Sequence, residues 1–116
     1  DDGLDEISIC SETIVSELKD NKISEYKISP KDYGLNVSSF DQIAANSSYE
    51  SFLLVNRAFN GESSAVQDMI ALNSGAALYI ANVVDSISDG IEMAFDCMNN
   101  GQAAQKLADY VRVSNE

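Results

Sequence analysis

The hydrophobic pattern of this 116-residue sequence changes once, between Gly34 and Ser39, from the two-residue period of strands to the 3.6-residue period of helices. A chain that changes in this way is expected to place a small sheet beside a group of helices. The sequence has no internal repeat and no low-complexity linker. Residues 1–116 are therefore expected to form a single α/β domain, or a fragment of one.

Three short strands are expected before the change. Residues 13–19 (TIVSELK) and 23–28 (ISEYKI) alternate in side-chain character, and Asp20 and Asn21 between them tolerate the positive φ of a tight hairpin turn. Residues 5–10 (DEISIC) alternate Ile7 with Ile9 and are predicted as a third strand. So small a sheet leaves one face and its edges unpaired, so further strands are expected upstream. The first residue, Asp1 rather than Met, also favours a piece of a longer protein.

The remaining residues are predicted to be helical. Ser29, Pro30 and Asp32 form a helix-start signal, and Gly34 is expected to end that turn. About five helices are then expected, over approximately 39–45, 48–61, 64–82, 86–98 and 102–111, with Ser88 as the alternative start of the fourth. The side chains expected to face inward are Val66, Met69, Ile70, Ala76, Ala77 and Ile80 on the third helix, Ile91, Ala94, Phe95 and Met98 on the fourth, and Leu107, Tyr110 and Val111 on the last. The alanine-rich middle of the third helix favours close helix packing.

Composition excludes several classes of function. The 19 acidic and 7 basic residues give a formal charge of −12, which disfavours nucleic acid and anionic membranes as partners. No apolar run approaches the ~20 residues that cross a bilayer. The absence of histidine excludes Ser-His-Asp and Cys-His catalysis within this chain. Cys10 and Cys97 match no metal-binding spacing and are expected to be buried free thiols in a reducing cytosol, with a disulfide as the alternative.

One segment could hold a metal ion. The opening DDGLDE places Asp1, Asp2, Asp5 and Glu6 within six residues, and Gly3 permits a sharp turn between them. Carboxylates on such a loop suit Mg²⁺, which takes one or two of them together with water and substrate phosphates. Spacing alone also fits a solvated loop with no metal, and neither a glycine-rich phosphate cradle nor a catalytic residue is identified in the chain.

Asn73 is the other unusual residue, because it lies within an apolar helix where a buried amide needs partners. It is expected to make a structural hydrogen bond to a neighbouring loop or strand. A contact with a ligand is the alternative.

The order of these motifs resembles the C-terminal portion of the anthranilate phosphoribosyltransferase family. The resemblance rests on DDGLDEISIC, TIVSELK, ISEYKISPKDYGL and ALNSGAALYIA, and it covers essentially the whole chain. It implies the C-terminal half of a nucleoside phosphorylase/phosphoribosyltransferase-type catalytic domain. The implied activity transfers phosphoribosyl from 5-phosphoribosyl-1-pyrophosphate to anthranilate in tryptophan biosynthesis. The resemblance also implies that Asp5 and Glu6 bind Mg²⁺.

The family's donor-binding loop, its anthranilate contacts and its dimerising helical domain would lie upstream. The resemblance therefore implies that the isolated chain is inactive, and that the parent protein is a cytoplasmic homodimer. Two other interpretations stay open: a fragment of a related nucleoside phosphorylase, and a non-catalytic acidic domain whose sheet edge pairs with another chain.

Overall fold

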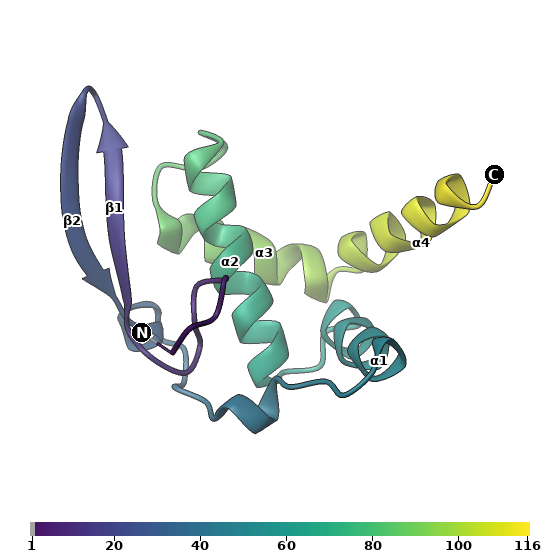
Figure 1. The fold of residues 1–116 in the computed structure, drawn as a ribbon. Coiled ribbons are helices and arrows are strands. Elements are labelled where there is room, and N and C mark those ends of the chain that lie inside the picture. The colour runs from purple at the N-terminus through teal and green to yellow at the C-terminus, as the bar shows by residue number, and fades with distance from the viewer. Residues whose placement is uncertain (1) are drawn as a thin grey trace.

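A β-hairpin and four α-helices make up most of the computed structural model, which describes residues 2–116. The hairpin and helix α4 (Gln102–Ser114) project from opposite sides of a central pair of helices (Figure 1). That pair is α2 (Ala65–Ile80) and α3 (Ile87–Asn99), with α1 (Ser48–Phe59) packed beside it. This arrangement confirms the expected α/β class.

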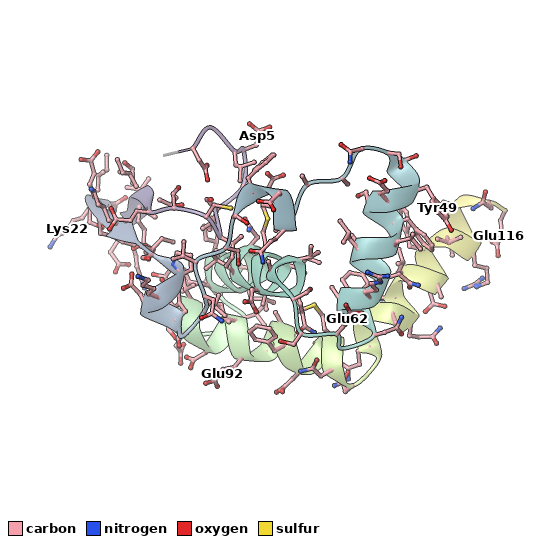
Figure 2. All side chains as sticks on the ribbon, turned by 90° about the horizontal axis from the view of Figure 1, so that it is seen from below. Asp5, Lys22, Tyr49, Glu62, Glu92 and Glu116 are labelled. Carbon is pink, nitrogen blue, oxygen red and sulfur yellow. The ribbon has the colours of Figure 1, made fainter. Side chains whose placement is uncertain are left out.

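The hairpin joins β1 (Thr13–Lys19) to β2 (Lys22–Ile28) in antiparallel register, with Lys19 opposite Lys22. Asp20 and Asn21 form the two-residue turn with φ of 51° and 60°, which confirms the predicted hairpin. Lys19 and Lys22 are the last pair of the ladder, and Figure 2 shows the Lys22 side chain pointing outward at the edge of the molecule. Within residues 2–116 these are the only two strands, so both outer edges of the sheet lack a strand partner.

The predicted strand over residues 5–10 is wrong. The backbone of this segment bonds to side chains and to another loop instead of a strand: Ile7 pairs with the Asn73 carboxamide, and the Ile9 carbonyl accepts the Ser38 N–H at 3.1 Å. Ile7 and Ile9 are apolar because this loop packs against the core, where Ile9 is fully buried, and not because the segment is a strand. Period two over so few residues does not distinguish these cases.

Two single turns of 3₁₀ helix follow the hairpin. The first, η1 (Pro30–Tyr33), begins as predicted, because Asp32 Oδ2 accepts the Ser29 N–H at 2.7 Å. It ends at Gly34, whose φ is 72°. The second, η2 (Phe40–Gln42), replaces the longer helix predicted over 39–45.

A serine side chain caps the N-terminus of each of the helices α1, α2 and α3. Ser47, Ser64 and Ser86 each accept the backbone N–H three residues later, which satisfies an amide that has no partner within the helix. The predicted start at Ser64 is confirmed, and of the two starts predicted for α3 the structure has Ser86 and not Ser88. Helix α1 is capped by Ser47 instead of Ser48. The predicted break at Asn99-Asn100-Gly101 is also confirmed.

The core lies where α2 crosses α3 and where the N-terminal segment covers them. Burial confirms the predicted inner face of α3 but corrects that of α2, because Ala77 is exposed and Ile80 is 77% exposed. An almost wholly apolar helix does not reveal which side is buried. The residues that form the buried cluster are Ile9, Leu35, Ala58, Ala71, Leu72, Ile91, Ala94 and Met98.

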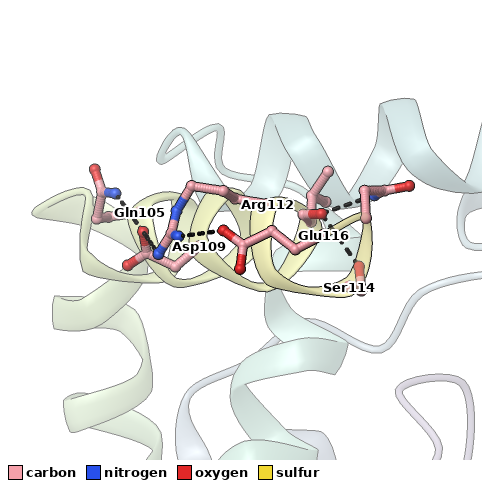
Figure 3. A network of polar contacts seen from close by, with 7 residues as sticks. Gln105, Asp109, Arg112, Ser114 and Glu116 are labelled. Atoms are coloured by element: carbon pink, nitrogen blue, oxygen red, sulfur yellow. Dashed lines mark hydrogen bonds and ion pairs between the residues drawn. The ribbon is translucent and has the colours of Figure 1, made fainter.

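Helix α4 has no buried residue, and Tyr110 and Val111 are exposed, contrary to the inward face predicted for them. Its polar side chains mainly contact one another along the helix (Figure 3). Arg112 lies 3.0 Å from Glu116 and 4.0 Å from Asp109. Exposed ion pairs of this kind contribute little to stability. The position of α4 therefore depends on its limited packing against α1 and α3.

Candidate functional site

The acidic loop, residues 2–11, lies beside the middle of α2 (Figure 1). It begins with a sharp turn at Gly3, whose φ of 84° favours glycine. Asp2 supports this turn, because its Oδ1 accepts the Leu4 N–H at 3.2 Å. The permissive glycine predicted between the acids is therefore confirmed.

Asp2 is a structural residue of the acidic loop. Its Oδ2 accepts hydrogen bonds from the hydroxyls of Ser8 and, at 3.2 Å, Ser11. The Ser8 hydroxyl in turn accepts the Cys10 N–H at 2.9 Å, and Ser8 is almost completely buried. The hydrogen bond from Ser8 and, secondarily, that from the Leu4 N–H lower the pKa of Asp2 below its ordinary value. Asp2 is therefore occupied in holding the loop together.

Asn73 connects the acidic loop to α2. Its Oδ1 accepts the Ile7 N–H at 2.9 Å, and its Nδ2 donates to the Ile7 carbonyl at 2.9 Å. Nδ2 also donates to the Met69 carbonyl at 3.0 Å, one turn earlier in the same helix. The predicted hydrogen bond from Asn73 to a neighbouring loop is confirmed.

Asp5 and Glu6 differ from Asp2 in their surroundings. Both are exposed, and their carboxylates make no hydrogen bond or ion pair with residues 2–116. Figure 2 shows Asp5 at the outer edge of the molecule. Asp1, the fourth acid of the motif, lies outside the described residues.

The donor set of Asp5 and Glu6 fits Mg²⁺. Both side chains offer hard carboxylate oxygens that are not engaged elsewhere in residues 2–116. No group of three or more metal-ligating side chains comes together in the described part of the chain. The loop thus offers two carboxylates instead of a closed cage, as suits an ion whose other ligands are water and substrate phosphates.

A cavity of about 450 Å³ lies between the inner face of the hairpin and α2, and sequence reasoning did not predict it. Lys19 and Tyr79 both line this cavity. The Lys19 ammonium donates to the Tyr79 hydroxyl at 3.2 Å and lies 5.1 Å from the ring centroid. This hydrogen bond is the main cause of the raised pKa of Lys19. The two residues are 60 positions apart, so no local pattern pairs them. The lining includes Ile7, Val15, Tyr26, Ile28 and Ile80.

Two other expectations concern the whole chain. Cys10 and Cys97 are both free thiols, as predicted, but each is half-buried and not buried as expected. None of the helices in residues 2–116 has the length and apolar character that crossing a membrane requires.

Comparisons with known proteins place the chain beside one group of enzymes. A curated anthranilate phosphoribosyltransferase from Vesicomyosocius okutanii subsp. Calyptogena okutanii is 43% identical over 97% of this chain and 33% of its own length. The crystal structure of anthranilate phosphoribosyltransferase from Thermus thermophilus matches 97% of this chain and 33% of that chain, with a TM-score of 0.85 and 26% identity. This chain therefore spans about a third of the length of the relatives it matches.

A variant of the Saccharomyces cerevisiae anthranilate phosphoribosyltransferase with Mg bound has the same fold over 91% of this chain and 31% of that chain, with a TM-score of 0.77 and 20% identity. Residues 1–104 match the glycosyl transferase family, a/b domain. Since that match covers most of the 116 residues and the fold agrees, the chain belongs to the glycosyl transferase family, as part of its α/β domain.

Proposed function

We propose that this chain is the C-terminal part of the catalytic domain of an anthranilate phosphoribosyltransferase. The full enzyme would transfer the phosphoribosyl group of 5-phosphoribosyl-1-pyrophosphate to the amine of anthranilate and release pyrophosphate. The observation that carries the proposal is the acidic loop. Asp5 and Glu6 are exposed, and their carboxylates make no hydrogen bond or ion pair with residues 2–116. Asp2 and Asn73 bind the backbone on either side of this pair, at Leu4 and Ile7. The similarity to curated transferases over 97% of the chain supports the same conclusion.

Asp5 and Glu6 are proposed to hold Mg²⁺ associated with the phosphoribosyl donor. Departure of pyrophosphate develops negative charge on oxygen, and bound Mg²⁺ stabilises such charge. The proposed contribution of this chain to the reaction is a pair of carboxylates at a fixed position beside the donor. Asp2, whose oxygens already accept three hydrogen bonds, is proposed to have no direct role in metal binding.

The residues that bind the two substrates are proposed to lie in the two-thirds of the relatives' length that this chain does not span. Residues 1–116 alone are therefore expected to show no phosphoribosyl transfer. The complete enzyme is proposed to be a cytoplasmic homodimer.

The test uses the full-length protein that carries this segment. Formation of phosphoribosyl anthranilate is measured against Mg²⁺ concentration for the unmodified protein, Asp5→Asn and Glu6→Gln. Each variant keeps the side-chain shape and removes one charge, so turnover at limiting Mg²⁺ should fall by about 100-fold. Glu92→Gln is the matched control, because Glu92 is an exposed acid on α3, far from the loop (Figure 2).

If both Asp5→Asn and Glu6→Gln kept normal turnover at limiting Mg²⁺, the proposal that these residues bind Mg²⁺ would be rejected. A full-length protein with no transferase activity at any Mg²⁺ concentration, or rapid turnover by residues 1–116 alone, would contradict the proposed function itself.

A further inference from the structure

We propose that Asn73 is a positioning residue: its carboxamide fixes the backbone at Ile7 and so places Asp5 and Glu6 for Mg²⁺. The inference rests on the proposed function, because it assigns to Asn73 a part in the same metal site. Asn73 itself does not touch the metal or the donor in this scheme. It acts through the two carboxylates that precede Ile7.

The Asn73 carboxamide pairs with a single residue of the acidic loop. Asn73 accepts from the Ile7 N–H and donates to the Ile7 carbonyl, both at 2.9 Å, so the side chain pairs with one residue as a neighbouring strand would. Its second N–H hydrogen has the Met69 carbonyl as partner at 3.0 Å. Both donors and the acceptor of the amide are used, which holds the carboxamide in one orientation.

Ile7 lies at the C-terminal side of the Asp5-Glu6 pair in the acidic loop. Ile7 directly follows Glu6, and the next two residues, Ser8 and Ile9, are buried. On the other side, Leu4 is tied to Asp2. The chain is thus anchored at Leu4 and Ile7, with only Asp5 and Glu6 between these points.

The carboxylates of Asp5 and Glu6 make no hydrogen bond or ion pair with residues 2–116 that would fix them. Their position therefore depends on the backbone anchors at Leu4 and Ile7. Mg²⁺ demands nearly ideal octahedral geometry, and small displacements of catalytic groups are costly. The anchor at Ile7 is a side chain on the rigid helix α2, so loss of Asn73 frees the C-terminal side of the pair.

Position 73 requires a side chain that both accepts and donates hydrogen bonds, as an amide does. An aspartate in place of Asn73 would still accept the Ile7 N–H, but it could not donate to the carbonyls of Ile7 and Met69. Its charge would also face those two carbonyl oxygens. Alanine would leave the Ile7 N–H and C=O without partners, at a cost typical of unsatisfied polar groups.

Gln67 provides a matched control within the same helix. It is a buried amide whose Nε2 donates to the Ala58 carbonyl and to Asn99 Oδ1, both at 3.1 Å. It therefore supports the packing of α1 and α3, and its hydrogen bonds go to Ser64, Ala58 and Asn99, outside the acidic loop. Replacing Gln67 should destabilise the fold without moving Asp5 or Glu6.

The experiment compares full-length Asn73→Ala, Asn73→Asp and Gln67→Ala with the unmodified protein. Three quantities are measured: the Mg²⁺ concentration that gives half-maximal turnover at saturating donor, the backbone hydrogen exchange of residues 5–9 without metal, and the Tm. Both Asn73 variants should raise the half-saturating Mg²⁺ concentration by about 10- to 100-fold and speed exchange in residues 5–9. Gln67→Ala should lower the Tm but leave the half-saturating concentration within about twofold.

Unchanged Mg²⁺ dependence in Asn73→Asp or Asn73→Ala would overturn the proposal, as would an equal Mg²⁺ shift in Gln67→Ala. If Asn73→Ala does not fold, Asn73→Asp and the conservative Asn73→Ser are judged by the same criteria. If neither folds, the role of Asn73 is structural and the proposal fails. Asp5→Asn and Glu6→Gln separate the two hypotheses: normal Mg²⁺ dependence in these variants rejects the metal site, whereas hydrogen exchange still reports whether Asn73 orders the loop.

Discussion

Gly75 on α2 lies directly against Gly90 on α3. A Cβ atom at position 90 would lie 2.4 Å from the Gly75 carbonyl oxygen, and one at position 75 would lie 2.6 Å from the backbone nitrogen of Ile91. Both glycines are buried, so the two helix backbones touch without side chains between them. This close crossing holds α2 in place, and α2 carries Asn73.

Gly90→Ala is therefore expected to destabilise the protein strongly. The new methyl group meets backbone atoms, which cannot rotate away, so the free energy of unfolding should fall by about 3 kcal/mol. Urea denaturation of the purified protein measures the change. Ser88→Ala is the control on the same helix, because Ser88 is not buried, and a loss of equal size in both variants would contradict the close crossing.

The hairpin turn provides a second prediction. Asn21 has a φ of 60°, a region that glycine adopts freely and β-branched residues avoid. Asn21→Gly should keep or slightly increase the stability, whereas Asn21→Val should lower it by about 1 kcal/mol. Lys22→Val is the control, since that residue is exposed in an extended strand. Equal effects of valine at both positions in thermal denaturation would argue against the left-handed turn.

The low pKa of Asp2 predicts how stability depends on pH. Its folded-state pKa lies below the ordinary value of 3.8, mainly because Ser8 donates a hydrogen bond to the carboxylate. The stabilisation is therefore fully present above about pH 4 and is lost as the pH falls through the folded-state pKa.

The measurement is the free energy of unfolding of the unmodified protein and of Asp2→Asn between about pH 2 and pH 7. The unmodified protein should be the more stable at neutral pH, and the difference should shrink at the acidic end. A difference that stays constant over the whole range would show that ionised Asp2 does not support the loop.

Local signals were sufficient to predict the hairpin and most helix starts. Asp20 and Asn21 carry their turn preference in their own side chains, and Ser64 and Ser86 cap helices through bonds that reach only three residues along the chain. The motif order also led to the correct family. These features require no knowledge of distant contacts.

Contacts between distant residues account for what the sequence did not predict. Residues 5–10 alternate like a strand, but Asn73, 66 positions from Ile7, supplies the pairing groups. The buried face of α2 includes Gly75, which packs against Gly90, and an apolar helix sequence does not reveal this partner. The composition of DDGLDE likewise could not show that Asp2 is bonded to Ser8 while Asp5 is free of such bonds in the described chain.

The most direct test of the acidic loop as a metal site is a crystal structure of the full-length protein with 5-phosphoribosyl-1-pyrophosphate and Mn²⁺ in place of Mg²⁺. Anomalous scattering locates Mn²⁺ without reference to any assumed ligand. We expect an anomalous peak at coordination distance, about 2.1 Å, from a carboxylate oxygen of Asp5 or Glu6, with Asn73 still paired to Ile7. A donor-bound Mn²⁺ coordinated elsewhere, with both carboxylates facing solvent, would contradict this expectation.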